Sequence, residues 1–178
     1  MKNQLKQIGK GSFTKAFLNQ DGECILHTID PVKVAMAEDL FVPSHRMFPN
    51  MEILEHCFDD DYYVMKTNYL PRPKSIKKNV TPRQWRFYRA LLDVYAVSRY
   101  RFSCHHKRTE GLYQAFKSMP NEFKAEKEAL LEMVDGLRNY CEAVAFEISP
   151  RNVTVRSGKL VLLDCFFDPF ALCKVRGC

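Results

Sequence analysis

Alternating apolar and polar positions in the first 70 residues predict a series of short β-strands. The Asp21-Gly22 pair between two such segments is typical of a tight hairpin turn. A further pair of segments is joined by an acidic turn, so neighbouring strands are expected to pair in antiparallel fashion. The expected strands lie at the two ends of residues 8–17 and at residues 23–28, 51–58 and 61–67.

Helical periodicity replaces this alternation in three later segments. Asp30 can cap a helix that has Pro31 in its first turn, and this helix is expected to reach about Phe41. Thr81-Pro82 gives a second helix a similar start, and a third begins near Asn121, with apolar side chains along one face. A sheet followed by helices predicts an α+β fold.

The length and composition are those of one domain. At 178 residues and 46% hydrophobic content, the chain can bury one sizeable core. We expect a single domain, residues 1–178, with a small antiparallel sheet lobe at residues 1–67 and a mainly helical lobe at residues 68–178.

The net charge of +6 is compatible with a nucleotide or nucleic-acid partner, although many other proteins carry as much charge. No apolar run reaches the roughly 18 residues of a membrane-spanning helix, so no membrane association is expected. Residues 1–5 lack the apolar core of a signal peptide. The expected location is the cytoplasm, or the host cytoplasm if the chain is viral.

The cysteines predict buried, reduced thiols rather than disulfides or a metal site, because they contain no Cys-x-x-Cys pair. Cys104-His105-His106 has ligand-type side chains, but no paired ligands lie nearby in the sequence, so a metal is not expected there. The seven positions are Cys24, Cys57, Cys104, Cys141, Cys165, Cys173 and Cys178.

The strongest chemical signal lies near the C-terminal end of the sequence. Glu147 and Asn152 are five residues apart on one tight loop, and residues 153–163 read as a short hairpin. The return strand of this hairpin is expected to deliver Asp164 next to Asn152. A carboxylate and an amide oxygen are hard ligands that suit Mg²⁺, so Asn152 and Asp164 are a candidate metal pair in a phosphoryl-transfer site.

A glycine-rich turn near the N-terminus supplies a second candidate part of that site. Glycines allow the backbone to approach a phosphate closely. The candidate nucleotide-binding residues of the turn are Gly9, Lys10, Gly11, Ser12 and Phe13.

Taken together and in this order, the motifs resemble those of a very small protein kinase-like domain, similar to the compact kinases that some bacteriophages encode. The resemblance implies a two-lobed kinase-like fold with ATP and Mg²⁺ as cofactors. Gly9 and Gly11 resemble the first two loop glycines, with Phe13 at the tip. Asn152 resembles the catalytic-loop Asn, and Asp164-Cys165-Phe166 resembles the Asp-Phe-Gly metal motif.

The chain also departs from the family pattern. Glu147 stands where the family has its catalytic Asp, and Thr14 replaces the third loop glycine. His27 stands where the family's phosphate-binding Lys is expected, and Glu38 is the candidate for the helix Glu that normally pairs with that Lys. Only fourteen residues follow Asp164, so the usual peptide-binding helices do not fit and the acceptor must be held in another way.

Three functions remain open. The favoured one is ATP- and Mg²⁺-dependent phosphoryl transfer to a protein Ser/Thr or another hydroxyl acceptor, with Glu147 as the base. The first alternative is a pseudokinase that binds and regulates a partner protein, with or without nucleotide. The second is a nucleic-acid-binding module that uses the basic residues 99–108 and 71–78, but these are expected to be a solvated helix end and a mobile linker, so nucleic acid is the least favoured partner.

Overall fold

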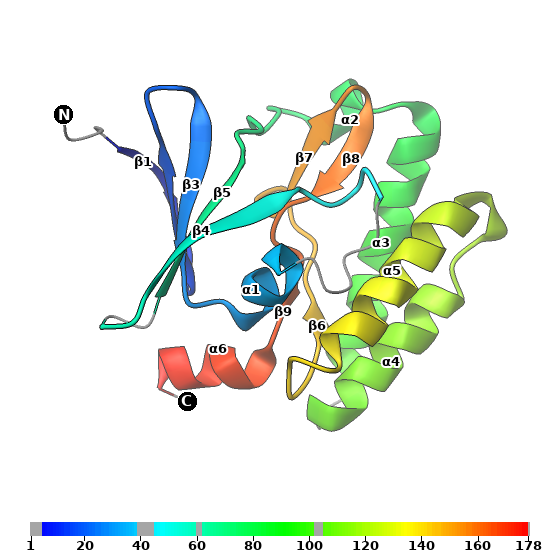
Figure 1. The fold of residues 1–178 in the computed structure, drawn as a ribbon. Helices are drawn as coiled ribbons and strands as arrows, with labels where there is room; N and C mark the ends of the chain where they lie inside the picture. Colours follow the sequence, from blue (N-terminus) through cyan, green and yellow to red (C-terminus); the bar gives the residue numbers. More distant parts are fainter. Residues whose placement is uncertain (1–4, 39–44, 60–61, 102–104, 178) are drawn as a thin grey trace.

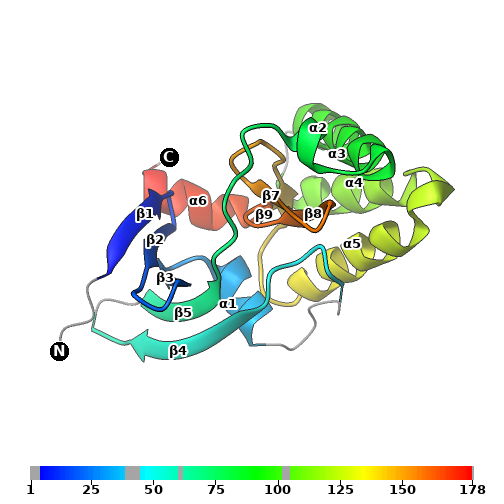
Figure 2. The same cartoon turned by 90° about the horizontal axis from the view of Figure 1, so that it is seen from above.

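A five-stranded antiparallel sheet with the order β1-β2-β3-β5-β4 forms the N-terminal part of the molecule, at the left of Figure 1. The computed structural model describes residues 5–38, 45–59, 62–101 and 105–177. Figure 2 shows the sheet and the helices side by side. The strands are β1 (Lys6–Lys10), β2 (Thr14–Leu18), β3 (Glu23–Thr28), β4 (Met51–Cys57) and β5 (Tyr62–Asn68), as the alternation predicted.

Helix α1 (Pro31–Ala37) follows β3 and lies between the sheet and the rest of the molecule (Figure 1). Its capping is as predicted, because Asp30 Oδ1 accepts a hydrogen bond of 3.0 Å from the Val32 amide and Pro31 occupies the first turn. The helix ends at Ala37, earlier than predicted, and residues 39–44 lie outside the described residues.

The helical part is built mainly from α3 (Pro82–Arg101), α4 (His105–Lys117) and α5 (Lys124–Leu137), with a short 3₁₀ turn, η1 (Asn121–Phe123), before α5. Helices α3 and α5 were predicted, whereas α4 was not. The three helices enclose the main core, whose large and fully buried members include Phe87, Leu91, Leu112, Phe116, Leu130 and Met133. This order of sheet and helices confirms the predicted α+β class and agrees with a kinase-like arrangement.

The basic segment 71–78 is not a mobile linker, and that prediction was wrong. Residues Ile76–Asn79 form the short helix α2, and Ile76 is buried in the main core. The hydroxyl of Thr154 donates a 2.6 Å hydrogen bond to the carbonyl of Pro71. The buried side chain of Ile76 and the hydrogen bond to the Pro71 carbonyl therefore hold segment 71–78 against the rest of the fold, although its charges had suggested that it is solvated.

Two small antiparallel strand pairs follow α5. β7 (Val153–Arg156) pairs with β8 (Lys159–Leu162) around a turn in which Ser157 and Gly158 both have positive φ, so the predicted hairpin is present. β6 (Ala145–Phe146) pairs with β9 (Phe166–Phe167). Helix α6 (Pro169–Arg176), which was not predicted, begins at the buried cap Asp168 and lies below the sheet in Figure 1.

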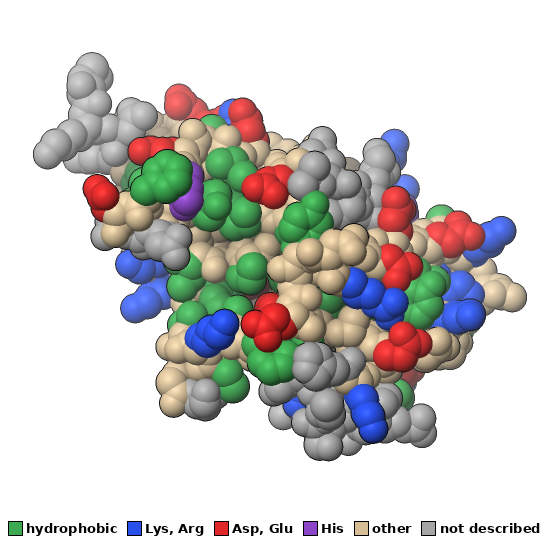
Figure 3. Space-filling model, turned by 60° about the horizontal axis from the view of Figure 1, so that its bottom comes forward, with side chains coloured by type: hydrophobic (Ala, Val, Ile, Leu, Met, Phe, Trp, Pro, Cys, Tyr) green, Lys and Arg blue, Asp and Glu red, His purple; other side chains and the backbone are tan. Residues whose placement is uncertain are grey.

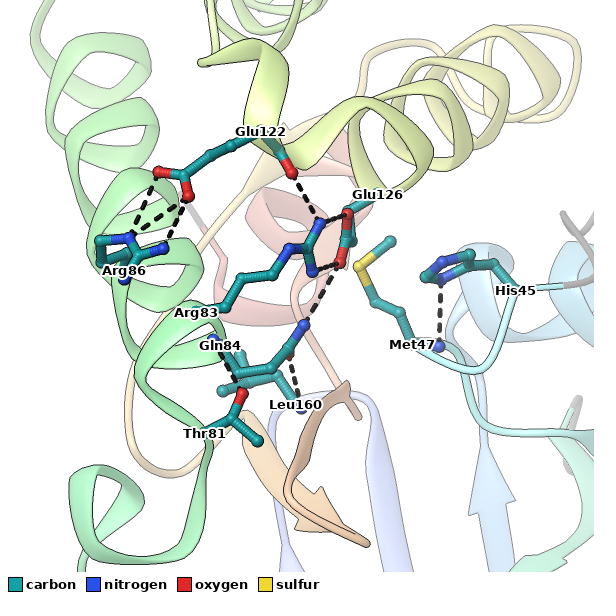
Figure 4. A network of polar contacts seen from close by, with 9 residues as sticks. All are labelled: His45, Met47, Thr81, Arg83, Gln84, Arg86, Glu122, Glu126 and Leu160. Atoms are coloured by element: carbon teal, nitrogen blue, oxygen red, sulfur yellow. Dashed lines mark hydrogen bonds and ion pairs between the residues drawn. The ribbon is translucent and has the colours of Figure 1, made fainter.

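A polar network fixes the hairpin to the helices (Figure 4). Glu126 on α5 is buried, and it forms an ion pair with Arg83 and accepts a 3.2 Å hydrogen bond from Gln84 Nε2, both on α3. The Oε1 atom of Gln84 then accepts a 3.0 Å hydrogen bond from the backbone amide of Leu160. Strand β8, which leads to Asp164, is thereby held against α3 and α5.

An aromatic cluster supports the segments on either side of the hairpin. Phe116 on α4 contacts Phe146 on β6 and Phe166 on β9, with ring centroids 5.2 and 6.2 Å apart. Phe146 and Phe166 are themselves 5.2 Å apart. All three rings are buried, so α4 fixes the chain just before Glu147 and just after Asp164.

Within the described ranges, the helices are all too short or too polar to cross a lipid bilayer.

Candidate active site

The backbone carbonyl of Asn152 brings the two predicted metal-binding positions together. It accepts hydrogen bonds from the amides of Leu163 and Asp164, at 2.8 and 3.3 Å, and from the thiol of Cys165 at 3.3 Å. The main-chain atoms of Asn152 and Asp164 therefore lie next to each other.

Glu147 lies on the same group of loops. Its amide donates a 2.8 Å hydrogen bond to the carbonyl of Cys165, and its own carbonyl accepts a 3.4 Å hydrogen bond from Asn152 Nδ2. Glu147 itself is exposed to solvent. The structure thus gathers Glu147, Asn152 and Asp164, which were identified from the sequence, within one set of backbone contacts.

Lys33 is part of the site although the sequence reasoning did not select it. Its Nζ donates to Asp164 Oδ1 and, over 3.0 Å, to Asp30 Oδ2. The Lys33 side chain is only 7% exposed and that of Asp30 only 1%, whereas the Asp164 side chain is 50% exposed. The ammonium therefore lies at the inner edge of a carboxylate that remains accessible from outside.

The charges of this trio act on each other in opposite directions: burial, together with the charge of Asp164, raises the pKa of Asp30, and the Lys33 ammonium offsets this in part. Burial by itself would lower the pKa of Lys33, but the carboxylates of Asp30 and Asp164 outweigh burial and hold its pKa above the ordinary value. Lys33 is consequently a permanent cation at neutral pH. A buried cation of this kind requires its paired carboxylates, because an unpaired buried charge is strongly destabilising.

The glycine-rich turn connects β1 and β2, and the amide of Gly11 donates a 2.8 Å hydrogen bond to the carbonyl of Thr14. A Cβ on Gly9 or Gly11 would meet its nearest neighbour only at 3.7 Å, and neither glycine has positive φ. The fold itself therefore does not require glycine at these two positions. Their lack of side chains fits a backbone left open to a phosphate group.

The tip of the turn contacts two other parts of the chain. Lys10 and Ser12 are exposed, and the Ser12 hydroxyl accepts a 3.1 Å hydrogen bond from Arg176 of α6. Phe13 is half-buried, and its carbonyl accepts a 3.0 Å hydrogen bond from the amide of Ile29, just before α1. The turn is thus linked both to α6 and to the start of α1.

The structure does not bring His27 to this site. On β3, Cys24 and Leu26 pack toward α1, so the side chain of His27 points to the opposite face of the sheet. Its ring lies 4.8 Å from that of Phe17 and is stacked 5.3 Å from that of Tyr62. Burial, and then the charge of Lys15, lower the pKa of His27, so that it is neutral at pH 7 and supplies no charge to a phosphate.

Glu38 also lies apart from the trio. It is exposed at the C-terminal cap of α1, beyond the end of the helix that begins with Lys33 in its first turn. A sequence signal for Lys33 did exist. Asp30 and Lys33 are three residues apart at a helix N-terminus, a spacing that places both side chains on one face.

The side-chain types present are those that bind Mg²⁺ and phosphate in proteins. Asp164 and Asn152 offer a carboxylate and an amide oxygen, and Mg²⁺ is usually held by one or two carboxylates together with waters and phosphate oxygens. In the part of the chain that the structure describes, His, Cys, Asp and Glu form no group of three or more suited to a metal held by protein alone. The cavity between Lys33, Phe48 and Asp164 has a volume of about 10 Å³, which is room for about one water molecule.

The charges on one face of the molecule bear on the nucleic-acid alternative. Figure 3 shows one face of the molecule, on which Lys and Arg side chains are interspersed with Asp and Glu side chains. In the basic segment 99–108, the side chains of residues 99–106 lie outside the described part of the chain.

No protein-family model and no curated protein matches the sequence. Solved aminoglycoside phosphotransferases are distantly similar in structure. A thermostable variant of APH(4)-Ia, in a complex with ADP and hygromycin B, has 14% identity and a TM-score of 0.38 over 94% of this chain and 69% of that one. ADP-bound APH(2'')-Ib has 12% identity and a TM-score of 0.41 over 94% and 68%. A likeness of this size indicates nothing about substrate or activity.

Proposed function

We propose that this chain binds a Mg²⁺–ATP complex and transfers a phosphoryl group to a hydroxyl acceptor. The observation that supports the proposal most directly is the grouping of Asn152 and Asp164 at one backbone carbonyl, with the Lys33 ammonium on the Asp164 carboxylate. The backbone contacts bring an amide-bearing residue and a carboxylate-bearing residue close together, and a buried cation lies on the carboxylate; these are the group types that a polyphosphate with a bound metal requires.

Each part of the site has a distinct role in this proposal. Asp164 and Asn152 hold the metal, which neutralises negative charge on the phosphates when it is bound. The turn from Gly9 to Phe13 covers the phosphates, and its glycines let the backbone approach them closely. The exposed carboxylate of Glu147 accepts the proton of the attacking hydroxyl, which belongs to a protein Ser/Thr or to another alcohol.

A thermal-shift titration with ATP, in the presence and absence of Mg²⁺, tests the binding part of the proposal. A ligand at about 100 times its dissociation constant adds about 2.7 kcal/mol to the unfolding free energy. We expect a Mg²⁺-dependent shift in the wild type that is lost in Asp164→Asn and retained in Asp93→Asn, a change at an exposed site on α3. An equal shift in Asp164→Asn would show that Asp164 is not a metal ligand.

Phosphoryl transfer is tested separately from binding. With γ-labelled ATP and a mixture of proteins or small alcohols as acceptors, Glu147→Gln should reduce the rate of transfer and leave the Mg²⁺-dependent shift unchanged. This separation follows because the Glu147 carboxylate is exposed and its backbone amide, not its side chain, bonds to Cys165. Transfer at the wild-type rate by Glu147→Gln would remove Glu147 from the role of base.

The contact of α6 with the turn favours a second candidate, a pseudokinase that binds a partner protein. Arg176 already occupies the Ser12 hydroxyl, and the cavity beside Asp164 has room for only about one water. Mg²⁺-dependent ATP binding without transfer to any acceptor, or no ATP binding at all, would favour this candidate over the phosphotransferase.

A further inference from the structure

We propose that Lys33, in the first turn of α1, is the residue whose ammonium binds the phosphate oxygens of the nucleotide. This inference rests on the proposed function and assigns to a helix the cation that the sequence analysis expected on strand β3. It also assigns Asp30 as the residue that positions this cation.

The first observation is that Lys33 lies where the two halves of the molecule meet. Lys33 comes from α1 and reaches Asp164, which is 131 positions further along the chain. Its side chain is almost fully buried, while the carboxylate that it contacts is half exposed. The ammonium therefore closes the inner side of the space in front of Asp164, where a metal-bound phosphate would have to lie.

The second step concerns the hydrogen bonds of the ammonium. A lysine ammonium has three N–H donors, and in the described residues its acceptors are Asp30 and Asp164. If the Asp164 carboxylate turns to a metal, Lys33 keeps its 3.0 Å ion pair with Asp30 and can donate to a phosphate oxygen instead. Asp30 thus allows the cation to change partners without becoming an isolated buried charge.

The third step is that β3 offers no replacement. The β3 side chains that face α1 include Cys24, Leu26 and Thr28, which are uncharged, and His27 points to the other face of the sheet. Any fixed cation between the sheet and Asp164 must therefore come from a neighbouring element. Lys33 is the buried cation that α1 supplies there.

The fourth step links this cation to the glycine-rich turn. The Asp30 amide donates a 3.1 Å hydrogen bond to the Thr28 hydroxyl, which lies 2.7 Å from the hydroxyl of Thr14 at the start of β2. Through these contacts, the residue that holds Lys33 is also held in a fixed relation to the turn. The turn and the ammonium can then contact the same polyphosphate from two sides.

Isothermal titration with ATP and with adenosine, both with Mg²⁺ present, tests the assignment. We expect Lys33→Met to weaken ATP binding at least tenfold and to leave adenosine binding unchanged, because only the phosphates meet the ammonium. Lys33→Arg should retain part of the ATP affinity, since it keeps the charge. Lys124→Met is the matched control, because Lys124 is exposed on α5, and it should bind ATP like the wild type.

The double variant Asp30→Asn/Lys33→Met covers the case in which Lys33→Met does not fold. It removes the buried carboxylate together with its cation, so no buried charge is left unpaired. Undiminished ATP affinity in the double variant, together with a loss in Asp164→Asn, would overturn the role of Lys33 and leave the proposed function standing. Equal losses for ATP and adenosine would also overturn it, because they indicate a structural effect. A wild type that binds no ATP would overturn both proposals.

Discussion

Thr14 and Thr28 face each other across strands β2 and β3, with their hydroxyl oxygens 2.7 Å apart. The Thr28 oxygen also accepts a hydrogen bond from the amide of Asp30. In the resemblance to kinase-like domains, Thr14 stands at the position of the third loop glycine. The Thr14 hydroxyl therefore connects the glycine-rich turn to the start of α1, which a glycine at this position could not do.

The first prediction concerns this connection. Thr28→Val keeps the shape of the side chain but removes its hydroxyl, so the buried amide of Asp30 loses its acceptor. We expect a loss of about 1–3 kcal/mol in the unfolding free energy, measured by urea denaturation. Thr67→Val is the control, because the Thr67 hydroxyl bonds to Asn50 at an exposed position where water can replace it. Equal losses in the two variants would contradict the prediction.

The second prediction compares two arginines one turn apart on α3. Arg83→Met leaves the buried carboxylate of Glu126 without its cation, and we expect a cost of about 1–3 kcal/mol in unfolding free energy. Arg86 pairs with Glu122, and both side chains are exposed, so Arg86→Met should cost less than about 1 kcal/mol. Chemical denaturation of both variants at neutral pH measures the difference. If Arg83→Met were no more harmful than Arg86→Met, the ion pair with Arg83 would not stabilise the buried Glu126.

The third prediction is a dependence of stability on pH. Burial would raise the pKa of Glu126, but the hydrogen bond and charge of Arg83 outweigh burial and hold the pKa below its ordinary value. A lowered pKa in the folded state stabilises the fold above the ordinary carboxyl pKa, and this contribution is lost as the pH falls through the lowered value. The stability difference between wild type and Glu126→Gln should therefore shrink from about pH 5 downward. A difference that stays constant to pH 3 would contradict this assignment.

The fourth prediction concerns thiol reactivity. Burial raises the pKa of Cys141 to about 12 and also raises that of Cys165, whose thiol donates to Asn152. Cys24 is buried as well, whereas Cys57 and Cys173 are half-buried. Alkylation of the native protein at pH 8, followed by mass spectrometry, should label Cys57 and Cys173 before the three buried thiols. Rapid labelling of Cys165 would show that the contact between Asn152 and the Asp164 segment opens readily.

The sheet and the major helices could be predicted because local chemistry determines them. Strand β3 coincides with the predicted residues 23–28, since its apolar residues and the Asp21-Gly22 turn before it are local signals. Asp30 and Pro31 likewise define the start of α1 by themselves.

Helices α4 and α6 were missed for a different reason. The first residues of α4 are strongly basic, so its apolar positions from Leu112 to Phe116 were not assigned to a core that only the packed helices create. Helix α6 is short, and Pro169 is its one buried residue in the described range, so it has little apolar periodicity. The N-cap of α6, Asp168, is buried. Its carboxylate accepts a hydrogen bond from the backbone amide of Glu142, 26 residues earlier in the chain.

Within the candidate site, the loop residues Glu147, Asn152 and Asp164 were predictable because they are close in sequence. Lys33 was not selected because its partner Asp164 is 131 residues away and only the fold brings them together. His27 was selected by its order along the chain. Order alone does not determine which face of a strand a side chain occupies, since neighbours alternate.

The contacts that shape the Asn152 loop have a consequence for how this protein can evolve. The backbone carbonyl of residue 152 accepts hydrogen bonds from the backbone amides of residues 163 and 164 and from the thiol of Cys165. The contact between residues 147 and 165 also joins two backbone groups. Most of these bonds persist whatever side chain stands at position 147 or 152. Substitutions at positions 147 and 152 should therefore change the side chains that the loop presents at little cost in folding, so that under the proposed function active and inactive variants would differ by few substitutions.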